Sequence, residues 1–395
     1  MMPHREHQRD AEPGRRPGRV AAAGFACVLA AGSLVLLGTG NVSARAVTCF
    51  GVPATLVVTT PGATTDGTPG NDVIVGTPGP DTIHGQGGDD LICGLTGDDV
   101  LIGGLGNDQI DGSAGADQLR GDSFSPSGNA TGGGNDRLLG GDGDDQFTGD
   151  SYAPGGTAEG GGNDQLIGGP GNDRLTGDSR GQNAVGGGVD RIDGGPGDDA
   201  LLGDSGAFAG NATGAGSDVL LGGPGVETMT GDSEAAQNAL GSGGNDLLDL
   251  GADGGVSAIG DHTVTNPAGG RAIGAGNDRI IGGAADEFLV GDSGPSDARR
   301  TAAGNDTISG GAGNDRVFGD NVDLTGTASA GTAGGADFLD GGDGIDTLKA
   351  GPAGDFLSGG PDGPDGPDGP DGPDACDGEG GTDFATGCET LAGLP

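Results

Sequence analysis

The sequence is poor in bulky residues and in basic residues. Its 395 residues include no Trp, one Tyr and only 3% aromatic residues, which is too little bulk for the core of a conventional globular domain. Lys and Arg number 17 against 59 Asp and Glu, so the formal net charge is −42. Without a basic surface, the chain is not expected to bind nucleic acid, and cations are its expected partners.

The sequence also lacks the common catalytic motifs. It contains no H-E-x-x-H or Walker string. Beyond residue 46 its histidines are His84 and His262, which we expect at the surface rather than in a catalytic role. Because an enzyme needs a non-repetitive constellation of residues, we predict that the chain is not an enzyme.

Glycine is abundant, with 96 residues, and it recurs with a nine-residue period. The string G-T-P-G-N-D-V-I-V at 67–75 repeats head to tail as far as Arg120, returns in pairs up to Ser358, and appears once more at 378–386. These twenty-three copies follow the template G-x-x-G-x-D-x-U-x, where U is usually a large apolar residue and the sixth position is always Asp or Glu. Periodic glycine predicts a solenoid with a thin core, built one coil at a time.

Each nonapeptide predicts a turn followed by a short strand. Glycines at positions one to six let the backbone turn its carbonyl groups to one side, and position eight of the following strand faces inward. Two repeats make one coil of eighteen residues, so Asp72 and Asp90 line one edge of the stack, while Asp81 and Asp99 line the other. Since adjacent coils lie about 4.8 Å apart, oxygens from two turns can share one cation.

An anionic, flexible, all-oxygen site suits Ca²⁺, which takes about six to eight ligands, better than Mg²⁺, which needs a tight octahedron. We therefore predict that the aspartates at position six bind multiple Ca²⁺ ions, and that folding and binding form one coupled transition. The predicted calcium ligands are Asp72, Asp81, Asp90, Asp99, Asp108, Asp117, Asp136, Asp145, Asp164, Asp173, Asp190, Asp199, Asp218, Asp246, Asp278, Asp306, Asp315, Asp337 and Asp346.

The repeats from Gly67 to Thr386 resemble the hemolysin-type calcium-binding family, also called RTX (repeats in toxin). The resemblance implies an all-β fold, a right-handed parallel β-roll or β-helix solenoid, in which the Asp at position six and the carbonyls of the Gly-rich turn hold Ca²⁺. Family members that act as toxins, proteases or lipases carry a separate catalytic domain, for which this chain has no room.

The repeat region has two parts, an uninterrupted block at 67–120 and a region at 121–359 with a longer period of about 28 residues. Each longer unit adds an insert of 8 to 13 residues, which begins with Gly-Asp-Ser or a variant and precedes the first nonapeptide of a pair. All inserts are therefore expected on one edge of the solenoid. Two interpretations of the Asp in this triplet stay open: it adds a metal ligand, or it caps its own loop by accepting backbone hydrogen bonds. These triplet aspartates are Asp122, Asp150, Asp178, Asp204, Asp232, Asp261, Asp292 and Asp320.

On the opposite edge, position six is irregular in three successive coils. It holds Glu227, then a degenerate turn at 250–259, then Glu287. Because Glu is one methylene longer than Asp, it crowds a site that is shaped for Asp. We expect the edge near residues 225–290 to hold calcium weakly or not at all.

The first 46 residues have the layout of a secretory signal peptide. Five Arg lie in residues 1–19, an apolar run follows at 20–37, and Ala44-Arg45-Ala46 matches an A-x-A cleavage site. The alternative is an uncleaved membrane anchor, because the apolar run is nearly long enough to span a bilayer. We predict a secreted, extracellular protein that is released or associated with the cell wall.

The two ends of the repeat region are predicted to be caps. Residues 47–66 are expected to contribute one strand that covers the open end of the stack. Residues 376–395 are expected to form a disulfide-closed cap after a Gly-Pro-Asp linker at 360–375. Four Cys remain after signal cleavage, and of their three connectivities we favour Cys49–Cys93 and Cys376–Cys388, with a zinc site as the competing interpretation.

These features predict an exported calcium-binding protein with a structural or cell-surface role. One alternative is a calcium-dependent adhesin, or another module that binds a glycan or a protein through the insert edge. A more distant alternative is a secreted hydrolase. The inserts are variable, small and polar, with an occasional aromatic residue such as Phe124, Tyr152 or Phe208, which favours a spacer over one dedicated pocket.

Overall fold

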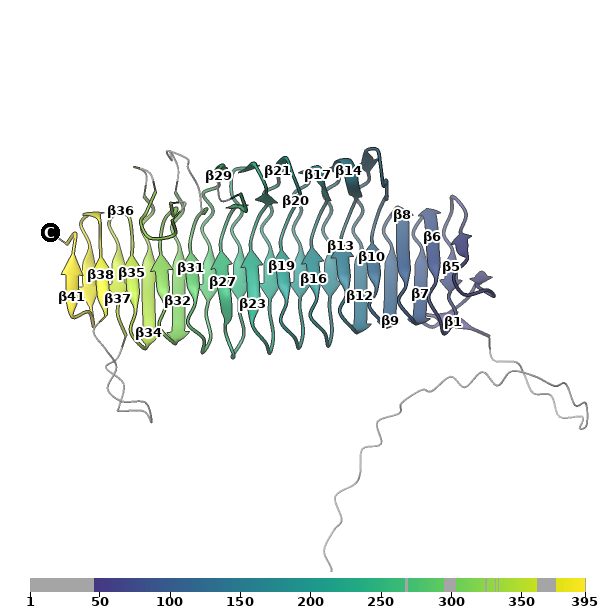
Figure 1. Ribbon diagram of the computed structural model, residues 1–395, viewed down its shortest axis with the longest axis horizontal. Helices are drawn as coiled ribbons and strands as arrows, with labels where there is room; N and C mark the ends of the chain where they lie inside the picture. Colours follow the sequence, from purple (N-terminus) through teal and green to yellow (C-terminus); the bar gives the residue numbers. More distant parts are fainter. Residues whose placement is uncertain are drawn as a thin grey trace, which may run out of the picture. The chain divides into compact units, whose positions relative to one another are not determined.

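Figure 1 shows the computed structural model of the chain. The structure describes residues 46–266, 269–294, 303–323, 325–330, 332, 334–360 and 374–394. The predicted signal peptide, except for its last residue, and most of the predicted Gly-Pro-Asp linker lie outside the described residues. All regular elements in the described part are β-strands. It contains no helix, and so none long and apolar enough to cross a membrane. This architecture confirms the predicted all-β fold class.

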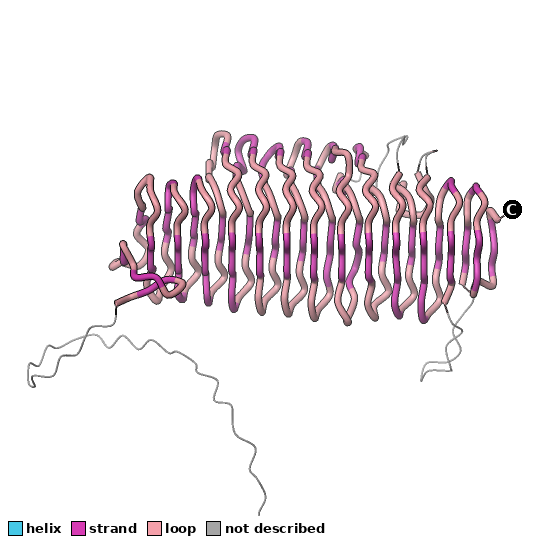
Figure 2. The backbone as a smooth tube through the Cα atoms, turned by 180° about the vertical axis from the view of Figure 1, so that it is seen from behind, coloured by secondary structure: helices cyan, strands magenta, loops and turns pink. Residues whose placement is uncertain are grey.

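Two parallel sheets of fourteen strands each form the solenoid (Figure 1, Figure 2). Successive repeats alternate between the sheets, so each coil adds one strand to each, as the eighteen-residue coil predicts. The first sheet contains, in spatial order, β3 (Leu56–Val57), β5 (Val73–Val75), β7 (Leu91–Thr96), β9 (Gln109–Ala114), β12 (Arg137–Asp142), β15 (Gln165–Ile167), β18 (Arg191–Asp193), β22 (Val219–Leu221), β26 (Leu247–Asp249), β30 (Arg279–Ile281), β32 (Thr307–Ala312), β34 (Phe338–Asp343), β37 (Phe356–Ser358) and β40 (Phe384–Thr386).

The second sheet also gains one parallel strand from each coil. It contains, in spatial order, β4 (Thr64–Asp66), β6 (Thr82–Gly87), β8 (Val100–Leu105), β10 (Gln118–Arg120), β13 (Gln146–Thr148), β16 (Arg174–Thr176), β19 (Ala200–Leu202), β23 (Glu227–Thr230), β27 (Gly255–Ile259), β31 (Phe288–Val290), β33 (Arg316–Phe318), β35 (Thr347–Lys349), β38 (Ala375–Asp377) and β41 (Thr390–Ala392).

Position eight of each repeat points between the two sheets and forms one continuous core. Ile74 pairs in register with Ile92 in the first sheet, and Ile83 pairs with Leu101 in the second, and all four side chains are fully buried. Burial of each such side chain contributes roughly 1.5–3 kcal/mol. Because every coil repeats this contact, one large apolar residue per strand is enough, and the fold needs few aromatic residues.

The N-terminal segment contributes more than the single covering strand that we expected. β1 (Thr48–Cys49) and β2 (Val52–Pro53) pair as an antiparallel hairpin, while β3 and β4 pair in parallel with β5 and β6. The segment thus forms the first coil, although it lacks the nonapeptide template. The physical reason is that Val58 reaches the core and Leu56 packs against it, while the strands satisfy the hydrogen-bonding groups at the end of each sheet.

Both predicted disulfides are present. The Cα atoms are 5.7 Å apart in Cys49–Cys93 and 6.0 Å apart in Cys376–Cys388. Cys376 is buried at the core position of β38, so the second disulfide lies inside the last coils. A small two-stranded sheet, β36 (Pro352–Ala353) with β39 (Gly380–Gly381), also joins coils near this end.

The first six inserts, between residues 121 and 273, form a third parallel sheet along one edge of the stack, so these inserts share one edge as predicted (Figure 1). The insert sheet itself was not predicted, because its inner face carries Ala at most positions, a pattern too weak to read as strands. Its strands are β28 (Thr263–Val264), β24 (Glu234–Ala235), β20 (Gly206–Ala207), β17 (Arg180–Val185), β21 (Asn211–Thr213), β25 (Asn238–Leu240) and β29 (Arg271–Ile273), with β14 (Tyr152–Glu159) beside β17 and β11 (Ala130–Thr131) beside β14.

The structure also corrects where each insert begins. A Cβ added to Gly85, at position one, would lie less than 3.0 Å from the position-six carboxylate of Asp90. A Cβ added to Gly121, the first residue of a Gly-Asp-Ser triplet, would likewise lie less than 3.0 Å from the position-six carboxylate of Asp136. The triplet therefore supplies positions one to three of the turn, and the insert interrupts the turn before position four. Most copies that directly follow an insert, such as the one that begins at Thr131, lack Gly at position one, which was the signal for this interruption.

Candidate metal sites

Carboxylates at position six form a ladder along each edge of the solenoid. In both ladders, the backbone N–H of one position-six residue donates to the Oδ1 atom of the equivalent Asp in the next coil. The distance is 2.7 Å from Asp72 to Asp90 and 2.8 Å from Asp145 to Asp173. The insert-edge ladder contains Asp72, Asp90, Asp108, Asp136, Asp164, Asp190, Asp218, Asp246, Asp278, Asp306, Asp337, Asp355 and Asp383.

The opposite ladder is built in the same way but has a gap. It contains Asp81, Asp99, Asp117, Asp145, Asp173 and Asp199, and it resumes with Glu287, Asp315, Asp346, Asp374 and Glu389. Each residue that the sequence predicted as a calcium ligand therefore lies in one of the two ladders.

Five carboxylates of the ladders were absent from the predicted set, one of them Glu287, which has Glu at position six. Asp355 and Asp383 fit the nonapeptide template, but Asp374 and Glu389 do not. The Gly-Pro-Asp segment separates Asp374 from the position-one glycine of its turn, so the template is broken in sequence although the geometry is kept. The signal that could have found Asp374 is Cys376, which stands two residues later at the core position.

The second oxygen of most ladder aspartates is buried and accepts no hydrogen bond. An unpartnered buried polar atom costs about 1–3 kcal/mol, and more when it is charged, so native proteins contain few of them. A long row of such atoms fits a bound cation. Within the described residues, this row comprises the Oδ2 atoms of Asp90, Asp99, Asp108, Asp117, Asp136, Asp145, Asp164, Asp173, Asp190, Asp199, Asp218, Asp246, Asp278, Asp306, Asp315, Asp337, Asp346, Asp355 and Asp383.

Glycine at position one brings backbone carbonyls to the same place. A Cβ on Gly85 would lie less than 3.0 Å from both the Oδ2 atom of Asp90 and the carbonyl oxygen of Gly103 in the next coil. No other residue type leaves room for both oxygens. Carboxylate and carbonyl oxygens from two turns are the donor set that Ca²⁺ takes in proteins. The donor atoms present therefore fit this ion.

Burial makes the ladders hard to ionise without a counter-charge. Loss of solvent, together with neighbouring carboxylates, raises the pKa of Asp99 from its usual 3.8 to about 7 and that of Asp136 to about 10. The ion pairs seen among the described residues involve Asp66, Asp232 and Glu379, none of which belongs to a ladder. The positive charge has to come from outside the chain.

The triplet aspartates are buried as completely as the ladders. Most of them accept a hydrogen bond from the backbone N–H at position four of their own turn, as Asp122 does from Gly134 at 2.9 Å and Asp292 from Gly304 at 2.8 Å. These bonds confirm the capping interpretation. They use one oxygen of Asp122, and its other oxygen accepts no hydrogen bond.

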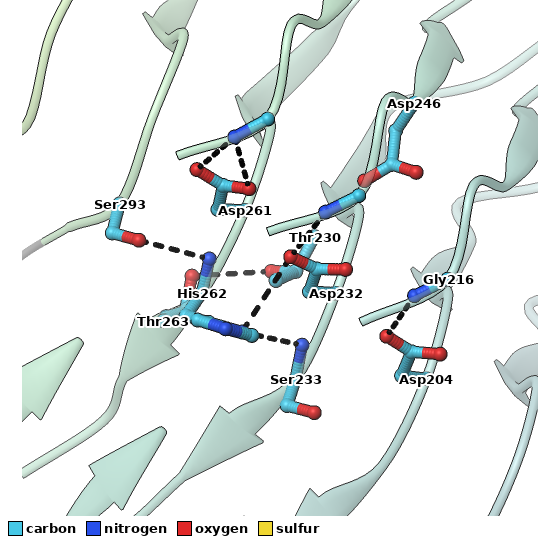
Figure 3. Close-up of polar contacts among 12 residues, drawn as sticks. Asp204, Gly216, Thr230, Asp232, Ser233, Asp246, Asp261, His262, Thr263 and Ser293 are labelled. Carbon is cyan, nitrogen blue, oxygen red and sulfur yellow. Dashed lines mark hydrogen bonds and ion pairs between the residues drawn. The ribbon is translucent and has the colours of Figure 1, made fainter. Parts of the chain in front are cut away.

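The expectation that His262 lies at the surface is wrong. Its side chain is fully buried, because the residue takes the third position of a triplet, where most other coils place a buried Ser. Its Nδ1 atom accepts a hydrogen bond from the backbone N–H of Ser233 at 3.1 Å and lies 3.8 Å from Oδ2 of Asp232 (Figure 3). His84 is partly exposed, and its Nδ1 atom lies 3.0 Å from Oδ1 of Asp66.

The gap in the opposite ladder falls at the turn that the sequence marked as degenerate. Position one of this turn is Leu250, whose side chain is buried in the core, and its position six is Gly255, which has no carboxylate. Both oxygens of Glu227 are buried and accept no hydrogen bond. The Oε1 atom of Glu287 turns back to accept the N–H of Gly255 at 3.3 Å. The regular pattern of oxygens is lost here.

The family comparison agrees with this geometry. The model for the RTX calcium-binding nonapeptide repeat (four copies) matches more than half of the chain, at residues 66–101, 94–125, 130–151, 160–179, 184–207, 212–235, 274–295, 300–323 and 332–363. No curated protein matches the chain. The matches include both the uninterrupted block and the units with inserts. Repeats of this family bind Ca²⁺, and the chain belongs to the family of RTX calcium-binding nonapeptide-repeat proteins.

Proposed function

We propose that this chain is an exported, non-catalytic structural protein whose solenoid assembles when Ca²⁺ binds to the two ladders. The observation that carries the proposal is the row of buried carboxylate oxygens that accept no hydrogen bond. Ca²⁺ supplies the charge that keeps these groups ionised inside the protein. The chain itself spaces the carboxylates one coil apart, fixes Oδ1 with a backbone N–H, and leaves Oδ2 beside the turn carbonyls.

An extracellular site of action fits the covalent chemistry of the chain. Two disulfides support folding in an oxidising compartment, and the N-terminal pattern of charges followed by an apolar run supports export. Extracellular calcium modules bind at about 10⁻⁴–10⁻³ M, so they are loaded outside the cell. A solenoid of this kind serves as a spacer or a surface element that becomes rigid after export.

Removal of calcium is expected to unfold the stack, because neighbouring carboxylates then repel one another. The far-ultraviolet circular dichroism spectrum of the secreted protein should lose its β-sheet signal in excess chelator. The signal should return when Ca²⁺ is added to about 1 mM, whereas Mg²⁺ at the same concentration should restore little of it. Equal spectra in chelator and in calcium would contradict the proposal.

The raised pKa values predict opposite effects of acid with and without calcium. Burial raises the pKa of Asp90 to about 6 and that of Asp108 to about 8. The folded, calcium-free chain therefore holds protons more tightly than the unfolded chain. Its stability should be greatest below about pH 4 and should fall as the pH rises through about 6–8. The calcium-loaded protein should instead be stable at neutral pH and lose its ions on acidification.

Thermal melts from about pH 4 to about pH 8 measure both effects. The melting temperature of the calcium-free protein should fall across this range, while that of the loaded protein should rise as the carboxylates become available. A calcium-free protein that becomes more stable as the pH rises would show that the buried carboxylates do not govern folding.

The gap in the opposite ladder predicts uneven calcium occupancy. Anomalous scattering from crystals grown in calcium should give strong peaks beside Asp145 and Asp173, where both oxygens follow the regular pattern. No peak is expected beside Gly255, which offers no carboxylate. Full-occupancy calcium in the turn at 250–259 would refute this assignment.

A groove between the second sheet and the insert sheet favours a second candidate function, the binding of an acidic glycan. One cavity of about 290 Å³ is lined by three Arg and no acidic residue, in a chain with 59 Asp and Glu. Arg120 is only 7% exposed, has Cζ within 4.7 Å of the ring centroids of both Phe124 and Tyr152, which stack on each other, and has an Nη1 atom that donates no hydrogen bond. Arg180 stacks on Phe208, with Cζ 4.9 Å from the ring centroid.

These groups match the chemistry of a carboxylated sugar. Fixed guanidinium groups bind carboxylates, while aromatic edges and the amides of Gln118 and Gln146 suit sugar rings and hydroxyls. A second cavity of about 250 Å³ shares Arg174 and Arg180 with the first and is lined by one acidic residue, Glu234, so the groove continues along the stack. An extended acidic polysaccharide therefore fits it better than a small anion.

Titration calorimetry with a polyuronate, at saturating calcium, tests this function. Arg174→Gln should weaken binding by roughly tenfold, because one charge-assisted contact is lost. Arg191→Gln, an exposed Arg on the first sheet, is the matched control and should have no effect. Equal weakening by both variants would indicate unspecific charge attraction, and no binding by the native protein would exclude the glycan function.

A further inference from the structure

The triplet aspartates and the insert-edge ladder meet in a seam between the repeat turns and the inserts. Each triplet Asp stands at position two of an interrupted turn. In the uninterrupted block, the position-two residues Thr68 and Gln86 on the same edge are exposed. In the interrupted turns, by contrast, Asp122 and Asp150 are fully buried. The insert thus turns position two inward and places a second row of carboxylates beside the ladder.

Three groups of carboxylates converge in this seam. Each group contains two triplet aspartates from consecutive coils and the ladder Asp between them, with one oxygen from each all within 4.8 Å of one another. Consecutive groups share a triplet Asp. The three groups are Asp122, Asp136 and Asp150; Asp150, Asp164 and Asp178; and Asp178, Asp190 and Asp204.

The hydrogen bonding of the shared residues points to a ligand in the seam. Both carboxylate oxygens of Asp150 are buried and accept no hydrogen bond, and the same holds for one oxygen each of Asp122 and Asp178. Asp150 is fully buried, and it faces other carboxylates rather than donors. Capping of the loop therefore does not explain this residue, whose carboxylate remains available in a closed, all-oxygen environment.

We propose that this seam binds a second row of Ca²⁺ ions, separate from the sites between the turns of the ladders. The inference rests on the proposed calcium-dependent fold. The three groups together contain seven carboxylates, three of which also belong to the ladder, so divalent ions in the seam offset the negative charge that the triplet aspartates add beside it. The shared aspartates Asp150 and Asp178 bridge neighbouring ions, which offsets the repulsion between cations in adjacent coils.

The row ends where each triplet Asp accepts a hydrogen bond from its own turn. Among the described residues no such group forms beyond Asp204. The backbone N–H groups of Gly216, Gly244 and Gly276, each at position four of a turn, donate to the triplet Asp of the same turn (Figure 3). Within the row, by contrast, Gly162 and Gly188 donate to the triplet Asp of the next coil, Asp178 and Asp204, and not to Asp150 and Asp178 of their own turns.

The single Tyr of the chain makes the seam accessible to a selective measurement. Tyr152 follows Asp150 by two residues, and the chain contains no Trp, so tyrosine-sensitised Tb³⁺ luminescence reports on ions bound near this end of the seam. Tb³⁺ occupies oxygen sites of the Ca²⁺ type. Mass spectrometry of metal content, at the same free calcium, counts all ions per chain.

Asp150→Asn is the main variant, because Asp150 belongs to two of the groups. It should lose about two ions per chain and most of the sensitised emission, while the calcium-induced circular dichroism spectrum persists. The matched control is Asp292→Asn, a triplet residue outside the groups whose oxygens are hydrogen-bonded to Gly304 and Asn321, and it should retain both signals.

If Asp150→Asn does not fold, Asp122→Asn, which belongs to one group at the end of the row, should lose one ion. Native metal content and emission in either folded variant would overturn the second row and leave the ladders intact. Absence of calcium binding by the native protein would instead overturn the proposed function itself.

Discussion

The fold depends on one electrostatic constraint, the stacking of buried carboxylates at the spacing of adjacent coils. Backbone N–H groups satisfy one oxygen of each ladder Asp, and the other oxygen is left beside turn carbonyls. A core of one apolar residue per strand gives too little stabilisation to overcome an uncompensated column of charge. Under the proposed function, folding and calcium binding form one equilibrium, in which calcium supplies the charge that the acidic composition requires.

Close approach at position one explains why the turns tolerate insertions. The contact between a position-one glycine and a position-six carboxylate is kept whether the intervening chain is short, as from Gly85 to Asp90, or long, as from Gly121 to Asp136. The same holds on the other edge, where the Gly-Pro-Asp segment lies between Gly359 and Asp374. Because loop length adds little to the cost of closure, the turn tips can grow while the ladders stay in register.

The two edges of the solenoid consequently differ. The insert-edge ladder is continuous, and beside it lie the seam of triplet aspartates, the insert sheet and the groove that contains Arg120 and Arg180. The opposite ladder carries no insert sheet and is broken where Leu250 fills the core and Gly255 replaces a carboxylate. The insert edge thus carries a ladder, the seam, the insert sheet and the groove, whereas the opposite edge carries a single, interrupted ladder.

The sequence by itself predicted the parallel solenoid, the inward residues such as Ile74 and Ile92 and most members of each ladder, because these follow from a local period. Both disulfides present in the structure are the pairings that the sequence favoured among three. The sequence also located the gap at 250–259. The tertiary structure alone decided that the triplets complete interrupted turns, that Asp374 joins a ladder, and that His262 and Asp150 are buried. These features depend on contacts between coils about 26 to 32 residues apart, whose spacing varies with insert length and so leaves no fixed period in the chain.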